Sequence, residues 1–270
     1  MSQKPARRLL SASAICMAAA ITSPVALGAD FCPIVELRQY TMFPGKRDAL
    51  ISLFEERFIE TQEEVGIRVL GQFHDVNDAD RFVWVRGFDD MEQRKKALTD
   101  FYYGPVWKAH REQANATLYD NDDVLLLRPA SPGSGFSADS GARPAPGAKS
   151  AAGKFIVATI YYFSKEADNA FIGKFDRELM PLFARSGARV LARYVSDKSK
   201  NTFERLPVRE VDNVFVWFAS FDDRNAHDRY IAELARDAHW RDVLFGELRK
   251  SLLRPPETLM LQPTVRSLIR

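Results

Sequence analysis

The sequence predicts an α+β protein made of two ferredoxin-like βαββαβ units in tandem. The stretch "RFVWVRGFDD" at residues 81–90 returns as "NVFVWFASFDD" at residues 213–223, and Trp84 and Trp217 are 133 positions apart (217 − 84). In the same way, "GIRVL" at 66–70 returns as "GARVL" at 187–191, at an offset of 121 (187 − 66). Self-similarity of this kind indicates that one structural unit is duplicated.

The offset between the copies grows by 12 residues along the chain (133 − 121). The change falls within the polar stretch 196–212, "SDKSKNTFERLPVREVD", which carries a proline. We therefore predict a longer loop at this place in the second unit.

Each unit shows the same order of predicted elements. In the first unit, "IVELRQYTM" at 34–42 alternates as a strand does, and it is followed by a helix. Strands at 67–73 and 81–88, a helix over 91–113 that Gly104-Pro105 should break or bend, and a strand at 122–129 complete the unit. The second unit repeats this order from 155–163 to 257–263. The first helix of the first unit is predicted from apolar residues that share one face, namely Leu50, Leu53, Phe54, Phe58 and Val65.

These patterns predict domains at 33–129 and 154–263, joined by a flexible linker at 130–153. The linker is rich in Ser, Pro, Gly and Ala and has few apolar side chains to offset the entropy of ordering. It contains "GSGFSA" at 133–138, which formally fits a dinucleotide-binding pattern. No apolar helical stripe follows that segment, so we predict no nucleotide cofactor.

Residues 1–29 are predicted to be a cleaved export signal. Lys4, Arg7 and Arg8 precede a modest apolar stretch, and small residues before Asp30 suit cleavage after Gly28 or Ala29. We therefore expect a periplasmic or secreted protein, with a mitochondrial presequence as the alternative. Polar residues interrupt the apolar stretch, which makes it a poor membrane anchor and argues against an integral membrane protein.

Charge and cysteine content exclude further classes. Removal of the three basic residues of the signal changes the formal net charge from +2 to −1 (2 − 3), and the remaining basic residues alternate with acids on predicted helices. This pattern argues against a nucleic-acid partner. Cys32 would be the lone cysteine after cleavage, so no intrachain disulfide is expected.

Metal and catalytic motifs are not recognisable. The four histidines lack the helical spacing of a metalloprotease site. "DVNDAD" at 75–80 begins like a calcium loop but has Asp80 where the turn needs glycine. The chain also lacks a phosphate-binding Gly-Lys loop and a nucleophile elbow. We expect no metal and no cofactor.

The third strand of each unit has one large aromatic face and one compact face. Phe82 and Trp84 alternate with Val83 and Val85, and Phe215 and Trp217 occupy the corresponding positions in the second unit. We predict that helices cover the compact valines and that the two aromatic faces pack on each other. An eight-stranded closed arrangement of this kind would leave an interior able to hold one small ligand.

The two units differ in charge at strand positions. Arg86 corresponds to Ala219, Arg38 to Thr159 and Glu36 to Val157. These positions predict a polar pocket on one side of an aromatic chamber, whereas the alternative is a buried ion pair that serves packing only. The candidate pocket residues are Glu36, Arg38, Tyr40, Trp84, Arg86 and Trp217.

At these residues the sequence resembles the NIPSNAP family of the dimeric α/β barrel superfamily. The resemblance rests on the order and spacing of "VELRQYTMFPGK", "GIRVLGQF", "FVWVRGFDDMEQR", "FYYGPVWKAH" and "NDDVLLLRP". It covers nearly all of the first unit and, more weakly, the second, and it implies a fused pair of barrel halves. The superfamily includes cofactor-free monooxygenases, isomerases and haem-handling enzymes. The predicted strands hold no histidine that could ligate haem.

Together these observations lead to two expectations for function. The first is an exported, non-catalytic barrel protein that binds a small apolar or anionic ligand or a protein partner. The alternative is a cofactor-independent monooxygenase or isomerase, in which Arg38, Tyr40 and Arg86 orient the substrate. Both are compatible with a homo-oligomer.

Overall fold

The computed structural model describes Met1 and residues 31–138, 141–149 and 153–270. Apart from Met1, the predicted export signal at 1–29 therefore lies outside the described residues. Within the described ranges, no helix is both long and apolar enough to cross a bilayer.

Eight antiparallel strands form a closed barrel in the order β1-β3-β2-β8-β5-β7-β6-β4. The order within each unit, β4-β1-β3-β2 and β8-β5-β7-β6, is that of a ferredoxin-like sheet, so the predicted fold class is confirmed. The strands are β1 (Ile34–Met42), β2 (Arg68–Asp75), β3 (Arg81–Phe88), β4 (Leu118–Pro129), β5 (Phe155–Phe163), β6 (Arg189–Ser196), β7 (Asn213–Phe221) and β8 (Glu257–Pro263).

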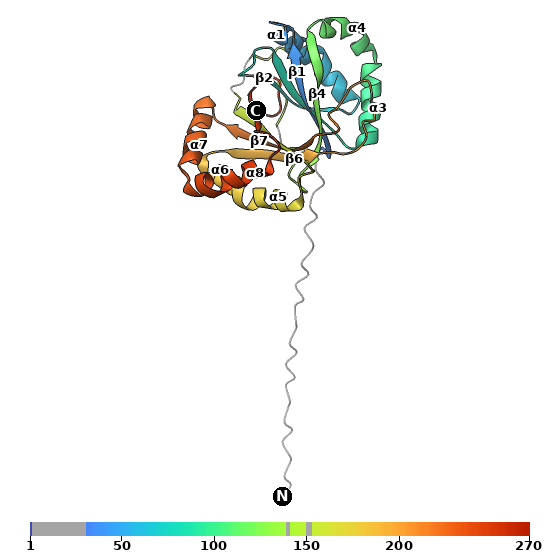
Figure 1. Ribbon diagram of the computed structural model, residues 1–270. Helices are drawn as coiled ribbons and strands as arrows, with labels where there is room; N and C mark the ends of the chain where they lie inside the picture. The colour runs from blue at the N-terminus through green and yellow to red at the C-terminus, as the bar shows by residue number, and fades with distance from the viewer. Residues whose placement is uncertain (2–30, 139–140, 150–152) are drawn as a thin grey trace.

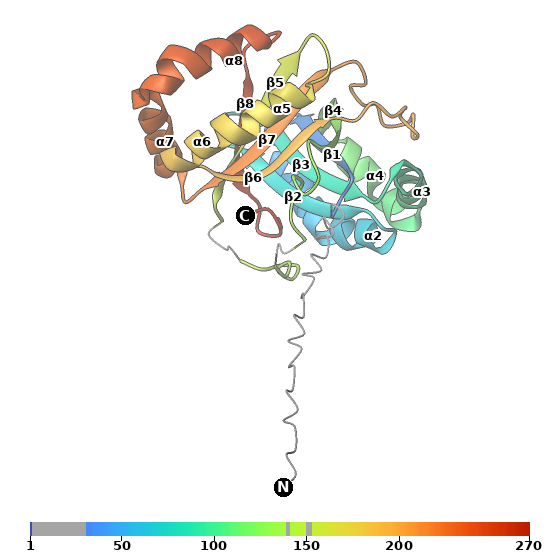
Figure 2. The same ribbon diagram turned by 90° about the horizontal axis from the view of Figure 1, so that it is seen from below.

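The helices lie outside the barrel in two groups, one for each half of the chain (Figures 1 and 2). The helix of 91–113 is broken at Gly104-Pro105, as predicted from the sequence. The first half contains α1 (Arg47–Leu53), α2 (Ile59–Glu64), α3 (Met91–Tyr102) and α4 (Pro105–Asn115), with a π-helical turn at Phe54–Phe58. The second half contains α5 (Asn169–Lys174), α6 (Met180–Ser186), α7 (Arg224–Arg236) and α8 (Phe245–Ser251), with π-helical turns at Phe175–Leu179 and Trp240–Leu244.

Pairing between the halves is reciprocal. The β2 strand of the first half pairs with β8 of the second, and β4 of the first half pairs with β6 of the second. Because each edge strand of one half pairs with an edge of the other, closure leaves neither sheet with an open edge.

The repeated "FDD" sequence has a local structural role. The carboxylates of Asp90 and Asp223 accept hydrogen bonds from the backbone N–H groups of Gln93 and Ala226, both at 2.7 Å. Each aspartate therefore caps the helix that follows the third strand of its unit. This explains why a strand followed by paired aspartates occurs twice.

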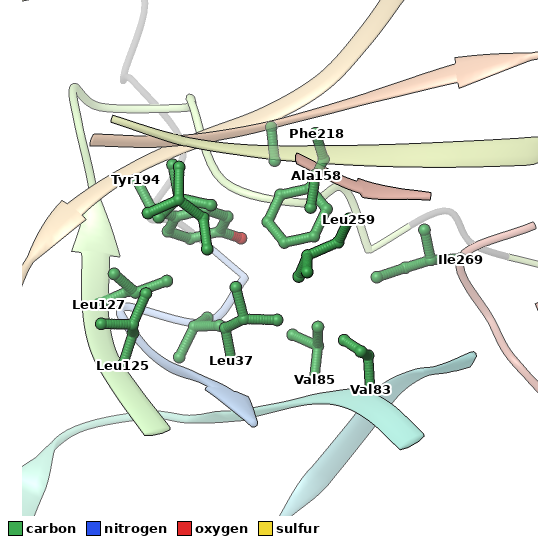
Figure 3. Close-up of a cluster of buried hydrophobic side chains, with 14 of the residues drawn as sticks. Leu37, Val83, Val85, Leu125, Leu127, Ala158, Tyr194, Phe218, Leu259 and Ile269 are labelled. Carbon is green, nitrogen blue, oxygen red and sulfur yellow. The ribbon is translucent and has the colours of Figure 1, made fainter. Parts of the chain in front are cut away.

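The compact faces of the two sheets, not the aromatic faces, form the barrel interior. Figure 3 shows Leu37, Val83 and Val85 of the first half meeting Phe218 and Leu259 of the second. The predicted orientation of the sheets, with the aromatic faces packed together, is therefore wrong, as is the prediction of a ligand in the barrel interior. The interior of a closed eight-stranded barrel can be filled by side chains, and here branched aliphatic residues and several aromatic rings fill it.

The aromatic faces are covered by the helices instead. Trp84 and Phe82 pack beneath the helices of the first half, and Trp217 and Phe215 pack beneath those of the second. The helix–sheet layers therefore bury the tryptophans of both halves.

The structure differs from two further expectations, one about the linker and one about histidines in the strands. Phe136, within the expected linker, is buried in the barrel interior, where its ring centroid lies 4.9 Å from that of Phe218. The linker therefore does contribute to the core. In addition, β2 extends to Asp75 and so includes His74, contrary to the expectation that the strands hold no histidine. His74 lies 3.3 Å from Asp48 and is partly exposed.

We predict that Phe136→Ala lowers the free energy of unfolding by about 3 kcal/mol, because the substitution removes a ring from the barrel interior and leaves a cavity. Tyr119→Ala, which truncates a ring that is 69% exposed, serves as the control and should change stability by less than about 0.5 kcal/mol. Urea denaturation followed by circular dichroism measures both values. Equal, small losses for the two variants would show that the linker does not contribute to the core.

Candidate ligand cavity

Four charged side chains meet between the sheet and the helices of the first half. Glu36 on β1 accepts hydrogen bonds from Arg38 Nη1 at 2.6 Å and from Arg86 Nε on β3 at 2.7 Å, both at Oε2. Its other oxygen accepts from Arg94 Nε on α3 at 2.7 Å. All four side chains are fully buried. The alternation of β1 and the pairing of Glu36 with Arg86 place these groups on one face.

This cluster carries more positive than negative charge. Three guanidinium groups share one carboxylate, which leaves a formal charge of +2 (3 − 1) away from solvent. The Nη2 atoms of Arg38 and Arg86 have no hydrogen-bond partner among the described residues. Unpaired buried donors are costly in a medium of low dielectric.

The pKa of Glu36 reflects this environment. Burial opposes ionisation, but Arg86, Arg94 and Arg38 together outweigh it and hold the pKa of Glu36 well below its usual range. Glu36 is therefore ionised at neutral pH. Burial lowers the pKa of Arg94, with the positive charge of Arg86 acting in the same direction and Glu36 opposing it.

An aromatic cavity of about 210 Å³ lies beside this cluster. Tyr40 and Gln62 connect the two, because the hydroxyl of Tyr40 accepts a hydrogen bond from Arg38 Nε at 2.8 Å and Gln62 Oε1 lies 3.5 Å from Arg86 Nη1. The aromatic residues that line the cavity are Tyr40, Phe54, Phe58, Trp84, Phe101, Tyr102 and Trp107.

Several polar groups of the lining are hydrogen-bond donors. The indole N–H groups of Trp84 and Trp107 have no acceptor among the described residues. Burial raises the pKa of Tyr40, against the opposing effect of Arg38, so its hydroxyl stays protonated at neutral pH. That hydroxyl accepts from Arg38, which leaves its own proton free to be donated. The lining therefore suits a ligand that brings acceptor atoms.

The corresponding positions of the second half carry different residues. At the offset of 121, Gln62 corresponds to Phe183, whose ring stacks on Trp217 with the centroids 5.0 Å apart. A bulky ring thus occupies the space that Gln62 leaves beside Trp84. The charged cluster is replaced as well, since Glu36, Arg38, Arg86 and Arg94 correspond to Val157, Thr159, Ala219 and His227.

Five of the six candidate residues from the sequence lie together. Glu36, Arg38 and Arg86 form the cluster, while Tyr40 and Trp84 line the cavity beside it. Trp217 lies in the helix–sheet layer of the second half, apart from the others. No group of three or more His, Cys, Asp or Glu side chains suited to a metal ion occurs among the described residues.

Two polar residues that complete the charged cluster and join it to the cavity were missed from the sequence. Arg94 and Gln62 lie on helices, where strand alternation gives no information about them. The sequence did contain one signal for them: Arg94 aligns with His227 of the second unit, and Gln62 aligns with Phe183.

Because a single carboxylate pairs with all three arginines, we predict that Glu36→Gln lowers the free energy of unfolding by about 3–5 kcal/mol at pH 7. Arg86→Ala should cost less, because Glu36 keeps Arg38 and Arg94 as partners. Arg57→Ala, at an exposed position, is the control, and urea denaturation measures all three.

Wild type and Glu36→Gln, compared at several pH values, also test the depressed pKa of Glu36. Since the folded pKa is depressed, the stabilisation by Glu36 is complete above the unfolded value of about 4.3 and is lost as pH falls through the folded pKa. The stability gap between wild type and Glu36→Gln should therefore narrow below about pH 4. A gap of the same size at pH 7 and pH 3 would contradict the depressed pKa.

Comparison with known proteins finds similarity over the first half of the chain. Residues 35–132 match the NIPSNAP family. None of the curated proteins matches the sequence. An uncharacterised NIPSNAP-like domain protein of Burkholderia xenovorans is 27% identical, over 36% of this chain and 85% of its own, with a TM-score of 0.34.

Another structure matches most of the chain. A candidate monooxygenase of Fusobacterium nucleatum covers 86% of this chain and 92% of its own, at 11% identity and a TM-score of 0.51. At that identity the likeness concerns the fold alone. Residues 35–132 are therefore similar to a NIPSNAP domain, and the chain as a whole shares its fold with the Fusobacterium nucleatum protein.

Proposed function

We propose that this protein binds a small aromatic anion in the cavity of its first half and does not convert it. The observation that carries the proposal is the pairing of an aromatic cavity with donors that lack acceptors, beside a buried cluster of charge +2. An anion would accept from the free donors and offset the excess charge.

The size of the cavity limits the ligand. A dry apolar cavity of about 150 Å³ accommodates benzene. The cavity here is about 210 Å³ and therefore suits one or two fused rings with a small acidic substituent. Aromatic walls favour flat ring systems through edge-to-face and offset contacts.

The charged cluster supports binding without turnover. Glu36 is its carboxylate, and that group is held ionised by three arginines. A general base needs a pKa near the working pH and contact with the proton that it removes. The depressed pKa of Glu36 and its engagement with three guanidinium groups argue against this role.

One feature favours the enzymatic alternative, a cofactor-independent monooxygenase or isomerase. Donors placed in a water-poor aromatic cavity would stabilise the oxyanion of an enolate as well as a bound carboxylate. Turnover distinguishes the two functions, because a ligand that is recovered unchanged after prolonged incubation in air supports simple binding.

The predicted export is part of the proposal. N-terminal sequencing of the mature protein should begin at Ala29 or Asp30, because the small residues before these positions suit signal peptidase. A mature protein that retains Met1 would contradict export.

A substitution copied from the second half tests the cavity. We predict that Gln62→Phe, which copies Phe183, fills the space beside Trp84 and weakens binding of 2-naphthoate at least about tenfold, or ~1.4 kcal/mol. Isothermal titration calorimetry measures the Kd, and thermal melting verifies that the variant is folded, since overpacking costs about 1–3 kcal/mol.

Phe183→Gln is the matched control, because it makes the reverse change in the half without the cavity and should leave the Kd unchanged. Neutral naphthalene should bind wild type more weakly than 2-naphthoate does. If Gln62→Phe binds 2-naphthoate as wild type does, the ligand does not occupy this cavity.

A further inference from the structure

The insertion of the second unit forms part of the cavity of the first. The residues between β6 and β7 extend over the helices of the first half, where Phe203 and Leu206 are buried in its hydrophobic cluster. Asn201 Oδ1 accepts a hydrogen bond from Arg94 Nη1 at 3.0 Å, so the loop is attached to the charged cluster itself. The 12-residue difference between the copies is thus located at the site.

Hydrogen bonds within the loop hold its tip in place. Asn201 Nδ2 donates to the carbonyl of Leu206 at 2.9 Å, and the N–H of Leu206 donates to the carbonyl of Phe203 at 3.0 Å. Arg205 lies within this turn, between two anchored apolar residues. Its backbone position is therefore defined by the packing of its neighbours.

Arg205 lines the cavity and is also exposed to solvent. Its guanidinium lies over the ring of Tyr103, at 5.5 Å from the ring centroid. Among the described residues, no carboxylate forms a salt bridge with it. Arg205 also lines an adjoining open depression together with Lys95 and Lys200, which places it on the solvent side of the cavity.

The cavity therefore has positive charge on two sides. The buried side adjoins Arg38 and Arg86 through Tyr40 and Gln62, and the solvent side carries Arg205. We propose that Arg205 is the outer recognition residue of this cavity and that its ligand is a flat aromatic compound with an acidic group at each end. This inference rests on the proposed function and specifies its ligand class.

Two probes and two variants test the inference. Isothermal titration calorimetry compares 2-naphthoate, with one carboxylate, and naphthalene-2,6-dicarboxylate, with a carboxylate at each end. The proteins are wild type, Arg205→Ala and Arg254→Ala. Arg254 is the matched control, because it is also exposed and its guanidinium lies 3.6 Å from the ring centroid of Tyr162, but it does not line this cavity.

The expected result is that the dicarboxylate binds wild type about tenfold more tightly than 2-naphthoate does. Arg205→Ala should remove this difference between the two probes, while Arg254→Ala should leave both Kd values unchanged. The preference for the dicarboxylate should also weaken with added salt, because the outer contact is exposed.

Other results separate the two levels of the proposal. If 2-naphthoate binds but the dicarboxylate binds no more tightly, or if Arg205→Ala preserves the preference, the role of Arg205 is wrong and the proposed function stands. If neither probe binds wild type, the proposed function fails and the role of Arg205 fails with it.

Discussion

The first half of this protein depends on one buried carboxylate. Glu36 holds arginines from β1, β3 and α3 in a layer that aromatic and aliphatic side chains otherwise fill. The desolvation of four charged groups is unfavourable, and it is tolerated only because one acceptor binds all three donors with short hydrogen bonds. Such a cluster is a weak source of stability, but it fixes geometry. It joins α3 to the sheet and holds Tyr40 beside the cavity through Arg38.

The duplication supplies an internal comparison for this site. Both halves have the same strand order, the same aspartate caps and a π-helical turn at matching positions, Phe54–Phe58 and Phe175–Leu179. The second half nevertheless builds its helix–sheet layer with apolar side chains at the positions of Glu36 and Arg86, and with Phe183 at that of Gln62. The charges and the cavity are therefore not required by the fold. This difference between the halves supports the proposed role in binding.

Strand alternation predicted which residues share a face, but not which face lies inside. Glu36, Arg38, Tyr40, Trp84 and Arg86 were grouped correctly, because their positions on β1 and β3 alternate in register. The predicted orientation of the two faces was wrong, because the prediction placed the aromatic faces in the barrel interior without considering how little space that interior has. A closed eight-stranded barrel has a narrow interior, which suits Val83 and Val85, whereas a helix–sheet layer accommodates Trp84. Phe136 was missed because one apolar residue in a Ser-Gly-Pro-rich segment leaves no periodic signal.

The pairing of strands between the halves explains why the long β6–β7 loop of the second half contacts the first half. Since β4 of the first half pairs with β6 of the second, the β6–β7 loop of the second half starts at the boundary between the two. Residues added to that loop reach α3 of the first half, as the contact between Asn201 and Arg94 shows. The corresponding β2–β3 connection of the first half spans only residues 76–80. In this duplicated barrel the first unit holds the charged cavity, and the longer loop of the second unit supplies Arg205 and Leu206 to its lining.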